Sequence, residues 1–141
     1  MASQRHVPTK GARLPLWLAQ AAKFGLVGVL NTALDWGVYF LLTRLAGMGE
    51  LETLAKAISY GVGVLNSYFW NRRWTFRSRA GAGQTLLPFI LVNLVGTGIN
   101  SGVMALTTGL LGLPELLGLV LATGAALAWN FAASKFLVFR K

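Results

Sequence analysis

Two long uncharged stretches constrain this chain most. No Asp, Glu, Lys or Arg occurs from Ala80 to Pro114, and after Glu115 none occurs from Leu116 to Ser134. Such runs are typical of transmembrane helices, because about 20 residues at about 1.5 Å each cross a hydrocarbon core of about 30 Å. Charged residues make up 12% of the chain, against about 25% in average soluble domains. The composition therefore argues against a soluble domain.

The apolar pattern predicts an all-α integral membrane protein with four transmembrane helices. A polar, basic segment over residues 1–20 is expected to form a disordered cytoplasmic tail, followed by one transmembrane domain over residues 21–141. The short connections left between the spans predict two tandem helical hairpins. We expect the spans near Ala21–Thr43, Thr53–Asn71, Leu86–Leu111 and Glu115–Ser134.

Basic residues gather at one end of these expected helices. Of the 13 Lys and Arg residues, all but Arg44 and Lys56 precede the first span or lie at its start (Lys23), follow the second or follow the fourth. An excess of Lys and Arg marks cytoplasmic loops, so both termini are expected to be cytoplasmic. The net charge of +9 is thus a topology signal, and nucleic acid is not expected as a partner.

The two expected hairpins resemble each other in sequence. Gly28–Asn31 resembles Thr97–Asn100, and Arg72–Arg77 resembles Lys135–Arg140. Each unit has an even number of helices, so the two copies are expected to share one orientation as a parallel repeat. The alternative is that any two apolar hairpins ending in aromatic and basic residues look alike.

The same segments resemble a known family. The resemblance covers Lys23–Arg140 and is to the GtrA-like family, also called the GtrA/DPMS transmembrane domain. The motifs that carry it are Phe24–Thr32 with Asp35, the exit Asn71–Phe76, and the closing segments Trp129–Phe131 and Phe139-Arg140.

The resemblance implies a role in cell-surface polysaccharide or lipopolysaccharide biosynthesis at the bacterial cytoplasmic (inner) membrane. The expected activity is translocation of a polyprenyl-phosphate-linked sugar across the bilayer. The alternative is a non-transporting anchor that recruits a separate GT2-type prenyl-phosphate glycosyltransferase. A third class, the small multidrug transporters, fits the size but leaves the arginine-aromatic hairpin ends unexplained.

Asp35 is the one acidic residue in the interior of an expected span, since Glu115 stands at the first position of the fourth. An Asp at the centre of a membrane helix costs about 2.5 to 3.5 kcal/mol on insertion scales, so it should face other helices or a wet cavity. Counting along the helices places Lys56 at a similar depth, which makes an Asp35–Lys56 ion pair feasible. A purely structural pair and a substrate or proton site both remain open.

Amide side chains occur in every expected span. With Asp35 they are candidates for a polar path that accommodates a sugar head group, and hydrogen bonding between helices is the alternative role. Gly98 and Gly102 are spaced for close helix approach, for which homo-oligomerisation is one use. The candidate path residues are Asn31, Asp35, Asn66, Asn100 and Asn130.

Arginines and aromatic residues meet at the ends of both hairpins. Arg72 and Arg73, with Lys135 at the equivalent repeat position, are candidates for binding a lipid phosphate, because guanidinium groups bind phosphate with paired hydrogen bonds. The alternative role is anchoring at the membrane interface. We expect no enzyme, metal or cofactor, since the only histidine is His6 in the tail and no phosphate-binding loop or dinucleotide motif occurs.

Overall fold

Four helices make up the described part of the chain. The computed structural model describes residues 11–140, and no strand occurs among them. Each helix continues into a short π-helical turn, so the order is α1 (Leu16–Phe40), η1 (Leu41–Leu45), α2 (Glu52–Trp70), η2 (Asn71–Thr75), α3 (Ala82–Met104), η3 (Ala105–Leu110), α4 (Glu115–Ala133) and η4 (Ser134–Val138). The all-helical class predicted from the sequence is confirmed for these residues.

The first helix begins earlier than expected. Residues 16–20, placed in the tail by the sequence analysis, belong to α1, which starts directly after Pro15. Proline suits this position because it has no amide hydrogen to leave unpaired, and Pro114 precedes α4 in the same way. The first ten residues of the expected tail lie outside the described part of the chain.

Three of the helices are long and apolar enough to cross a membrane. They are Leu16–Leu45, Ala82–Leu110 and Glu115–Val138. The helix formed by α2 and η2 is not in this set, because Lys56, Asn66 and several hydroxyl-bearing residues lower its mean hydropathy. Of the four expected spans, the length and composition of the observed helices support three.

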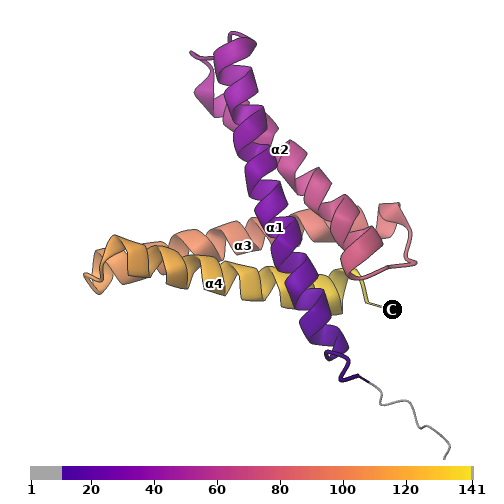
Figure 1. Cartoon of the computed structure of the whole chain (residues 1–141). Helices are drawn as coiled ribbons and strands as arrows, with labels where there is room; N and C mark the ends of the chain where they lie inside the picture. Colours follow the sequence, from indigo (N-terminus) through magenta and orange to yellow (C-terminus); the bar gives the residue numbers. More distant parts are fainter. Residues whose placement is uncertain (1–10, 141) are drawn as a thin grey trace, which may run out of the picture.

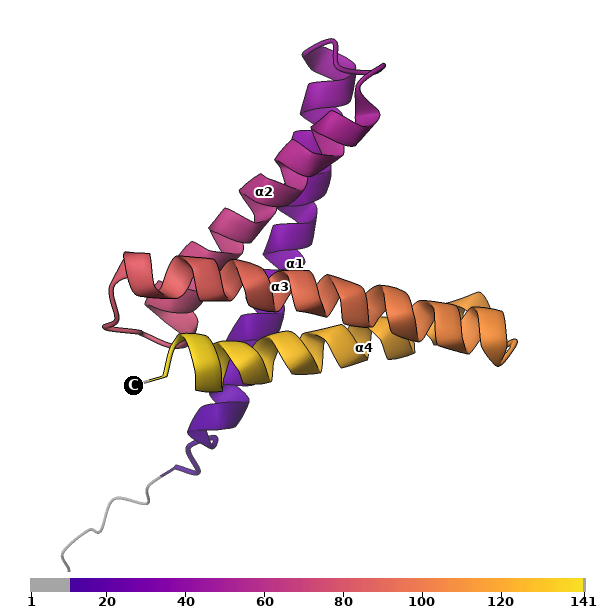
Figure 2. The same cartoon turned by 180° about the vertical axis from the view of Figure 1, so that it is seen from behind.

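The helices pair as two hairpins that diverge. Figure 1 shows α1 packed along α2 and α3 packed along α4, with the two pairs pointing in steeply different directions. They meet near the end of α2, the start of α3 and the end of α4, and the reverse view in Figure 2 shows the same junction. The two loop ends, after η1 and η3, therefore lie far from each other.

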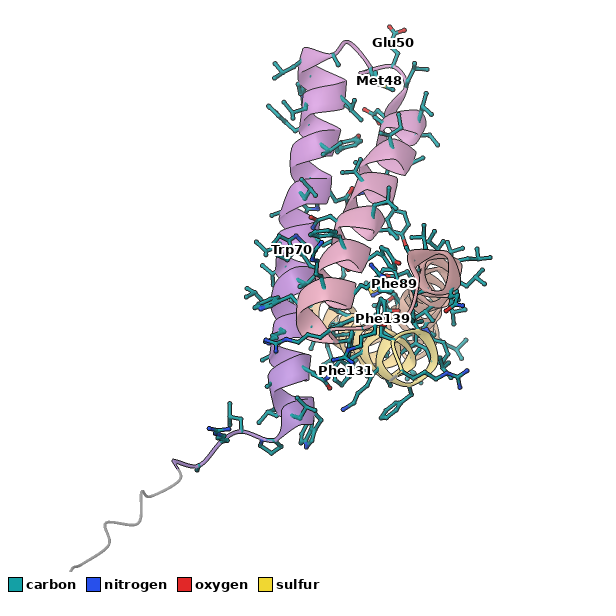
Figure 3. All side chains as sticks on the ribbon, turned by 90° about the vertical axis from the view of Figure 1, so that its right-hand side faces the viewer. Met48, Glu50, Trp70, Phe89, Phe131 and Phe139 are labelled. Carbon is teal, nitrogen blue, oxygen red and sulfur yellow. The ribbon has the colours of Figure 1, made fainter. Side chains whose placement is uncertain are left out.

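The hydrophobic core lies at this junction. Figure 3 shows Phe89, Phe131 and Phe139 where the second hairpin, seen along its helices, packs against the first. Met48 and Glu50 mark the distant tip of the first hairpin. The core residues come from all four α-helices, from η4 and from the residues directly after η2 and η4: Phe24, Val64, Tyr68, Phe76, Phe89, Val92, Ala133, Val138 and Phe139.

The buried positions also define how the two hairpins correspond. Phe24 of α1 and Phe89 of α3 are both buried, and so are the residues one turn before and after each of them. This register aligns Asp35 with Asn100, whereas the sequence comparison aligned Asn31 with Asn100. The two registers differ because the sequence comparison aligned residues of similar type, whereas the buried positions show which side of each helix packs against the rest of the protein.

Candidate functional site

Asp35 and Lys56 form an ion pair between α1 and α2. Lys56 Nζ donates a hydrogen bond to Asp35 Oδ2 over 2.7 Å. The Asp35 side chain is 17% exposed and the Lys56 side chain 54%. The ammonium group also lies 5.8 Å from the centre of the Tyr39 ring. Each charge neutralises the other within a helix pair that is otherwise mainly apolar, where an unpaired charge is costly.

A cavity of about 730 Å³ lies beside this pair, lined by Trp36, Gly37, Tyr39, Phe40 and Lys56. Trp36 and Phe40 are 70% and 57% exposed, so this cavity is an open, mainly aromatic hollow on the helix surface, of the apolar kind that small molecules occupy. None of these aromatic residues was predicted from the sequence as part of a site. The sequence did contain a clue to two of them. Trp36 and Tyr39 follow Asp35 by one and four residues, so on a helix both lie within about one turn of it.

Two of the predicted path asparagines lie inside separate hairpins. The Asn31 amide packs against Gly63 of α2, and the Asn130 amide packs against Gly96 of α3. A Cβ atom at Gly63 would lie 2.9 Å from Asn31 Oδ1, so glycine makes room for the amide. The Oδ1 atoms of both asparagines are buried and have no hydrogen-bond partner among the described residues.

The structure does not bring the five path residues together. Asn66 and Asn100 are partly buried, and no hydrogen bond within residues 11–140 joins any two of the five. Asn31, Asp35 and Asn66 belong to the first hairpin, and the other two belong to the second. Because the hairpins diverge (Figure 1), these five residues form two groups. A hydrogen bond between the Tyr60 hydroxyl of α2 and the Thr97 hydroxyl of α3, 3.1 Å apart, does join the two hairpins.

Close helix contact is made by other glycines than the pair singled out in the sequence. Gly98 and Gly102 have open space around them. Gly96 accommodates Asn130, and Gly118 accommodates Thr107 and Thr108 of the neighbouring helix end. Spacing alone could not identify these contacts, because it does not specify which side of a helix meets its neighbour.

The three predicted phosphate ligands have separate contacts. Arg72 Nη2 donates a hydrogen bond to the Ala80 carbonyl oxygen over 2.7 Å. The Arg73 guanidinium lies 5.8 Å from the centre of the Phe69 ring. Lys135 lines a cavity of about 310 Å³ whose walls contain neither arginine. The structure therefore does not gather Arg72, Arg73 and Lys135 around one ligand.

Three other arginines do share a cavity at the junction. It has a volume of about 510 Å³ and is lined by Arg77, Arg79, Ala80 and Arg140. From the sequence, none of the three was predicted as a phosphate ligand: all were interpreted as topology signals, Arg77 and Arg140 also as repeat positions, and Arg140 also as part of the family motif. The sequence did offer a reason to expect Arg77 and Arg140 near each other. Phe76-Arg77 and Phe139-Arg140 directly follow equivalent helix ends in the two hairpins.

These features define a helical membrane protein made of two similar hairpins that join at a basic, aromatic end. Over residues 23–139 the chain matches the model of the family described as GtrA/DPMS, transmembrane domain. The chain belongs to this family.

Several known proteins are similar over most of the chain. The uncharacterized membrane protein YngA of Bacillus subtilis (strain 168) is 36% identical over 118 residues, which cover 83% of this chain and 77% of that protein. The bactoprenol-linked glucose translocase of Salmonella phage P22 is 32% identical over 119 residues, covering 84% and 93%. The dolichol-phosphate mannosyltransferase of Pyrococcus furiosus is 29% identical over 93 residues, covering 62% of this chain and 26% of that enzyme.

Proposed function

We propose that this protein translocates a polyprenyl-phosphate-linked sugar between the leaflets of a bacterial cytoplasmic membrane, in the synthesis of cell-surface polysaccharide or lipopolysaccharide. The observation that carries this proposal is the similarity to the phage P22 translocase, which extends over 93% of that protein. Almost all of a protein named for moving a lipid-linked sugar thus has a counterpart in this chain. The proposed activity is transport and not catalysis.

The geometry suits an amphiphilic substrate in two respects. A basic end with aromatic side chains lies at the junction of the hairpins, where an anionic head group and an apolar chain both find suitable surfaces. Away from the junction, the paired charges of Asp35 and Lys56 adjoin the aromatic cavity of about 730 Å³. We propose that the basic junction first binds the phosphate of the lipid. The Asp35–Lys56 pair and the cavity beside it then accommodate the sugar during passage.

The asparagines contribute to passage from both hairpins in this proposal. Asp35 on α1 and Asn100 on α3 occupy equivalent repeat positions, so each hairpin offers one polar group at similar distance from the junction. Asn31 and Asn130 each carry a buried amide oxygen without a partner among the described residues. Such oxygens accept hydrogen bonds from sugar hydroxyl groups when the helices move apart.

We further propose that α2 is the fourth membrane span and that both chain termini are cytoplasmic. Pairing with Asp35 lowers the cost of placing Lys56 in the membrane. α1 with η1 has 30 residues, about 45 Å at about 1.5 Å each, so this helix can cross a core of about 30 Å while tilted. Diverging hairpins are compatible with such tilts.

Single cysteines test this topology cleanly, because the chain has none of its own. Glu50→Cys and Leu111→Cys are expected to react with a membrane-impermeant maleimide in intact cells. Gln84→Cys, at the exposed start of α3, is expected to react only after the membrane is permeabilised. Labelling of Gln84→Cys in intact cells would contradict the proposed orientation.

The second candidate function is a membrane anchor that recruits a GT2-type glycosyltransferase. One observation favours it: the chain is similar to about a quarter of the Pyrococcus furiosus mannosyltransferase, so a segment of this kind occurs together with a prenyl-phosphate glycosyltransferase in that protein. An anchor would co-purify with a glycosyltransferase and would move no lipid by itself. Reconstitution of the purified protein alone, followed by a translocation assay, separates the two functions.

A further inference from the structure

Three helix ends in this structure have the same backbone turn, but one carries an unusual residue. Backbone hydrogen bonds run from Met48 to Leu42, from Leu113 to Thr107 and from Ser78 to Arg72. Such a bond closes a helix end around one residue in the left-handed conformation, for which glycine is the usual residue. The residues in this conformation are Gly47 with φ 75°, Gly112 with φ 63° and Arg77 with φ 47°. At the junction, arginine replaces the glycine that the backbone favours.

The repeat places a second arginine beside the first. Arg77 follows Phe76, and Arg140 follows Phe139 at the corresponding end of the second hairpin. The Phe76 and Phe139 rings stack with their centres 5.5 Å apart and their planes 21° apart, and both side chains are 2% exposed. This buried stack holds the ends of the two hairpins together, so the arginines that follow it line one cavity.

Arg72 holds in place the segment that carries a third arginine, Arg79. Its Nη2 atom donates to the Ala80 carbonyl oxygen over 2.7 Å, and the Ala80 amide donates to Ser78 Oγ over 3.3 Å. These bonds fix the short segment that carries Arg79. Arg72 therefore positions the cavity wall while Arg77, Arg79 and Arg140 line the cavity of about 510 Å³.

No acidic residue balances these three charges. The four acidic residues of the chain are Asp35, Glu50, Glu52 and Glu115: Asp35 pairs with Lys56, and the glutamates lie at or next to the loops that connect the helices of each hairpin, away from the junction. No ion pair to Arg77, Arg79 or Arg140 occurs in the described structure. Like charges repel, so this arrangement favours binding of an anion from outside the chain.

We propose that Arg77, Arg79 and Arg140 form a phosphate-binding site. Guanidinium groups present paired N–H donors that match the oxygens of a phosphate. The adjoining cavity of about 310 Å³ shares Arg140 and is lined mainly by apolar and aromatic side chains, among them Leu16, Phe136 and Phe139. A phosphate joined to an apolar chain fits both cavities, while a free phosphate fits the first. The assignment to a lipid phosphate rests on the proposed function, whereas phosphate binding itself does not.

The test uses the purified full-length protein and measures binding of undecaprenyl phosphate, undecaprenol and inorganic phosphate by calorimetry in detergent. The main variant is Arg77→Gly, because glycine suits the left-handed backbone and the fold should be retained or stabilised. We expect this variant to bind undecaprenyl phosphate about tenfold or more weakly, since one charged hydrogen-bonding group is lost, with an unchanged or higher unfolding temperature. Arg44→Gln, which removes a positive charge at the distant tip, should bind like the unchanged protein.

The outcomes separate the possible ligands. Tighter binding of undecaprenyl phosphate than of the other two probes supports a lipid-phosphate site, and equally tight, Arg77-dependent binding of inorganic phosphate supports a site for free phosphate. Binding of undecaprenol as tight as that of undecaprenyl phosphate, or unchanged affinity in both Arg77→Gly and an Arg77→Gly/Arg140→Gln variant, would overturn the proposal. Arg77-dependent binding by a protein that moves no lipid-linked sugar would overturn the proposed transport function and leave the site intact.

Discussion

Replacing Phe89 with alanine is expected to lower the free energy of unfolding by about 3 to 5 kcal/mol, the usual cost of removing a buried aromatic ring. Phe89 is fully buried. Its ring centre lies 5.5 Å from that of Tyr68 on α2 and 5.6 Å from that of Phe139 after η4. The substitution therefore creates a cavity at the contact between the two hairpins. Denaturant titration of the detergent-solubilised protein, followed by circular dichroism, measures the loss.

Phe136→Ala is the matched control for this prediction. The Phe136 side chain is 63% exposed, and its removal should change the free energy of unfolding by about 0.5 kcal/mol or less, as at other surface sites. Equal effects of the two substitutions would contradict a core located at the junction of the hairpins.

Replacing Asp35 with asparagine is expected to leave membrane insertion intact and to slow translocation about 100-fold, which corresponds to about 2.7 kcal/mol of activation free energy. Asparagine keeps the size of the side chain and removes the charge that pairs with Lys56 over 2.7 Å. In the proposed function Asp35 also accepts hydrogen bonds from the passing sugar, and the neutral amide of asparagine accepts weaker ones than a carboxylate does. Translocation in proteoliposomes measures the rate, and protease protection measures insertion.

The double variant Asp35→Asn/Lys56→Gln distinguishes a structural pair from a transport residue. It removes both charges, so no unpaired Lys56 charge is left between the helices. Stability should return close to that of the unchanged protein while translocation stays slow. Recovery of translocation in the double variant would show that the pair is only structural.

Much of this architecture follows from local properties of the sequence. Uncharged runs predict the α3 and α4 helices because a membrane span needs only length and apolar composition. The positions of Lys and Arg predict which helix ends lie together, since all but Arg44 and Lys56 lie near one end of the expected spans. Counting residues along two helices was enough to suggest that Asp35 and Lys56 lie within reach of each other.

The remaining features depend on tertiary packing, which residue spacing does not encode. The divergence of the hairpins arises at the aromatic core, where six rings from distant segments pack together. That divergence separates the path asparagines into two groups. Likewise, the sequence favoured Arg72 and Arg73 as phosphate ligands, but the backbone turn after η2 places Arg77 and Arg79 at the cavity.

Translocation by the purified protein alone tests the central claim most directly. The protein is reconstituted into liposomes that contain a labelled undecaprenyl-phosphate-linked glucose, and a membrane-impermeant reagent then modifies the sugar accessible from outside. We expect the inner-leaflet share to become accessible in the presence of the protein, and more slowly with Asp35→Asn. If the inner-leaflet share stays as protected as in protein-free liposomes, the protein is not a translocase.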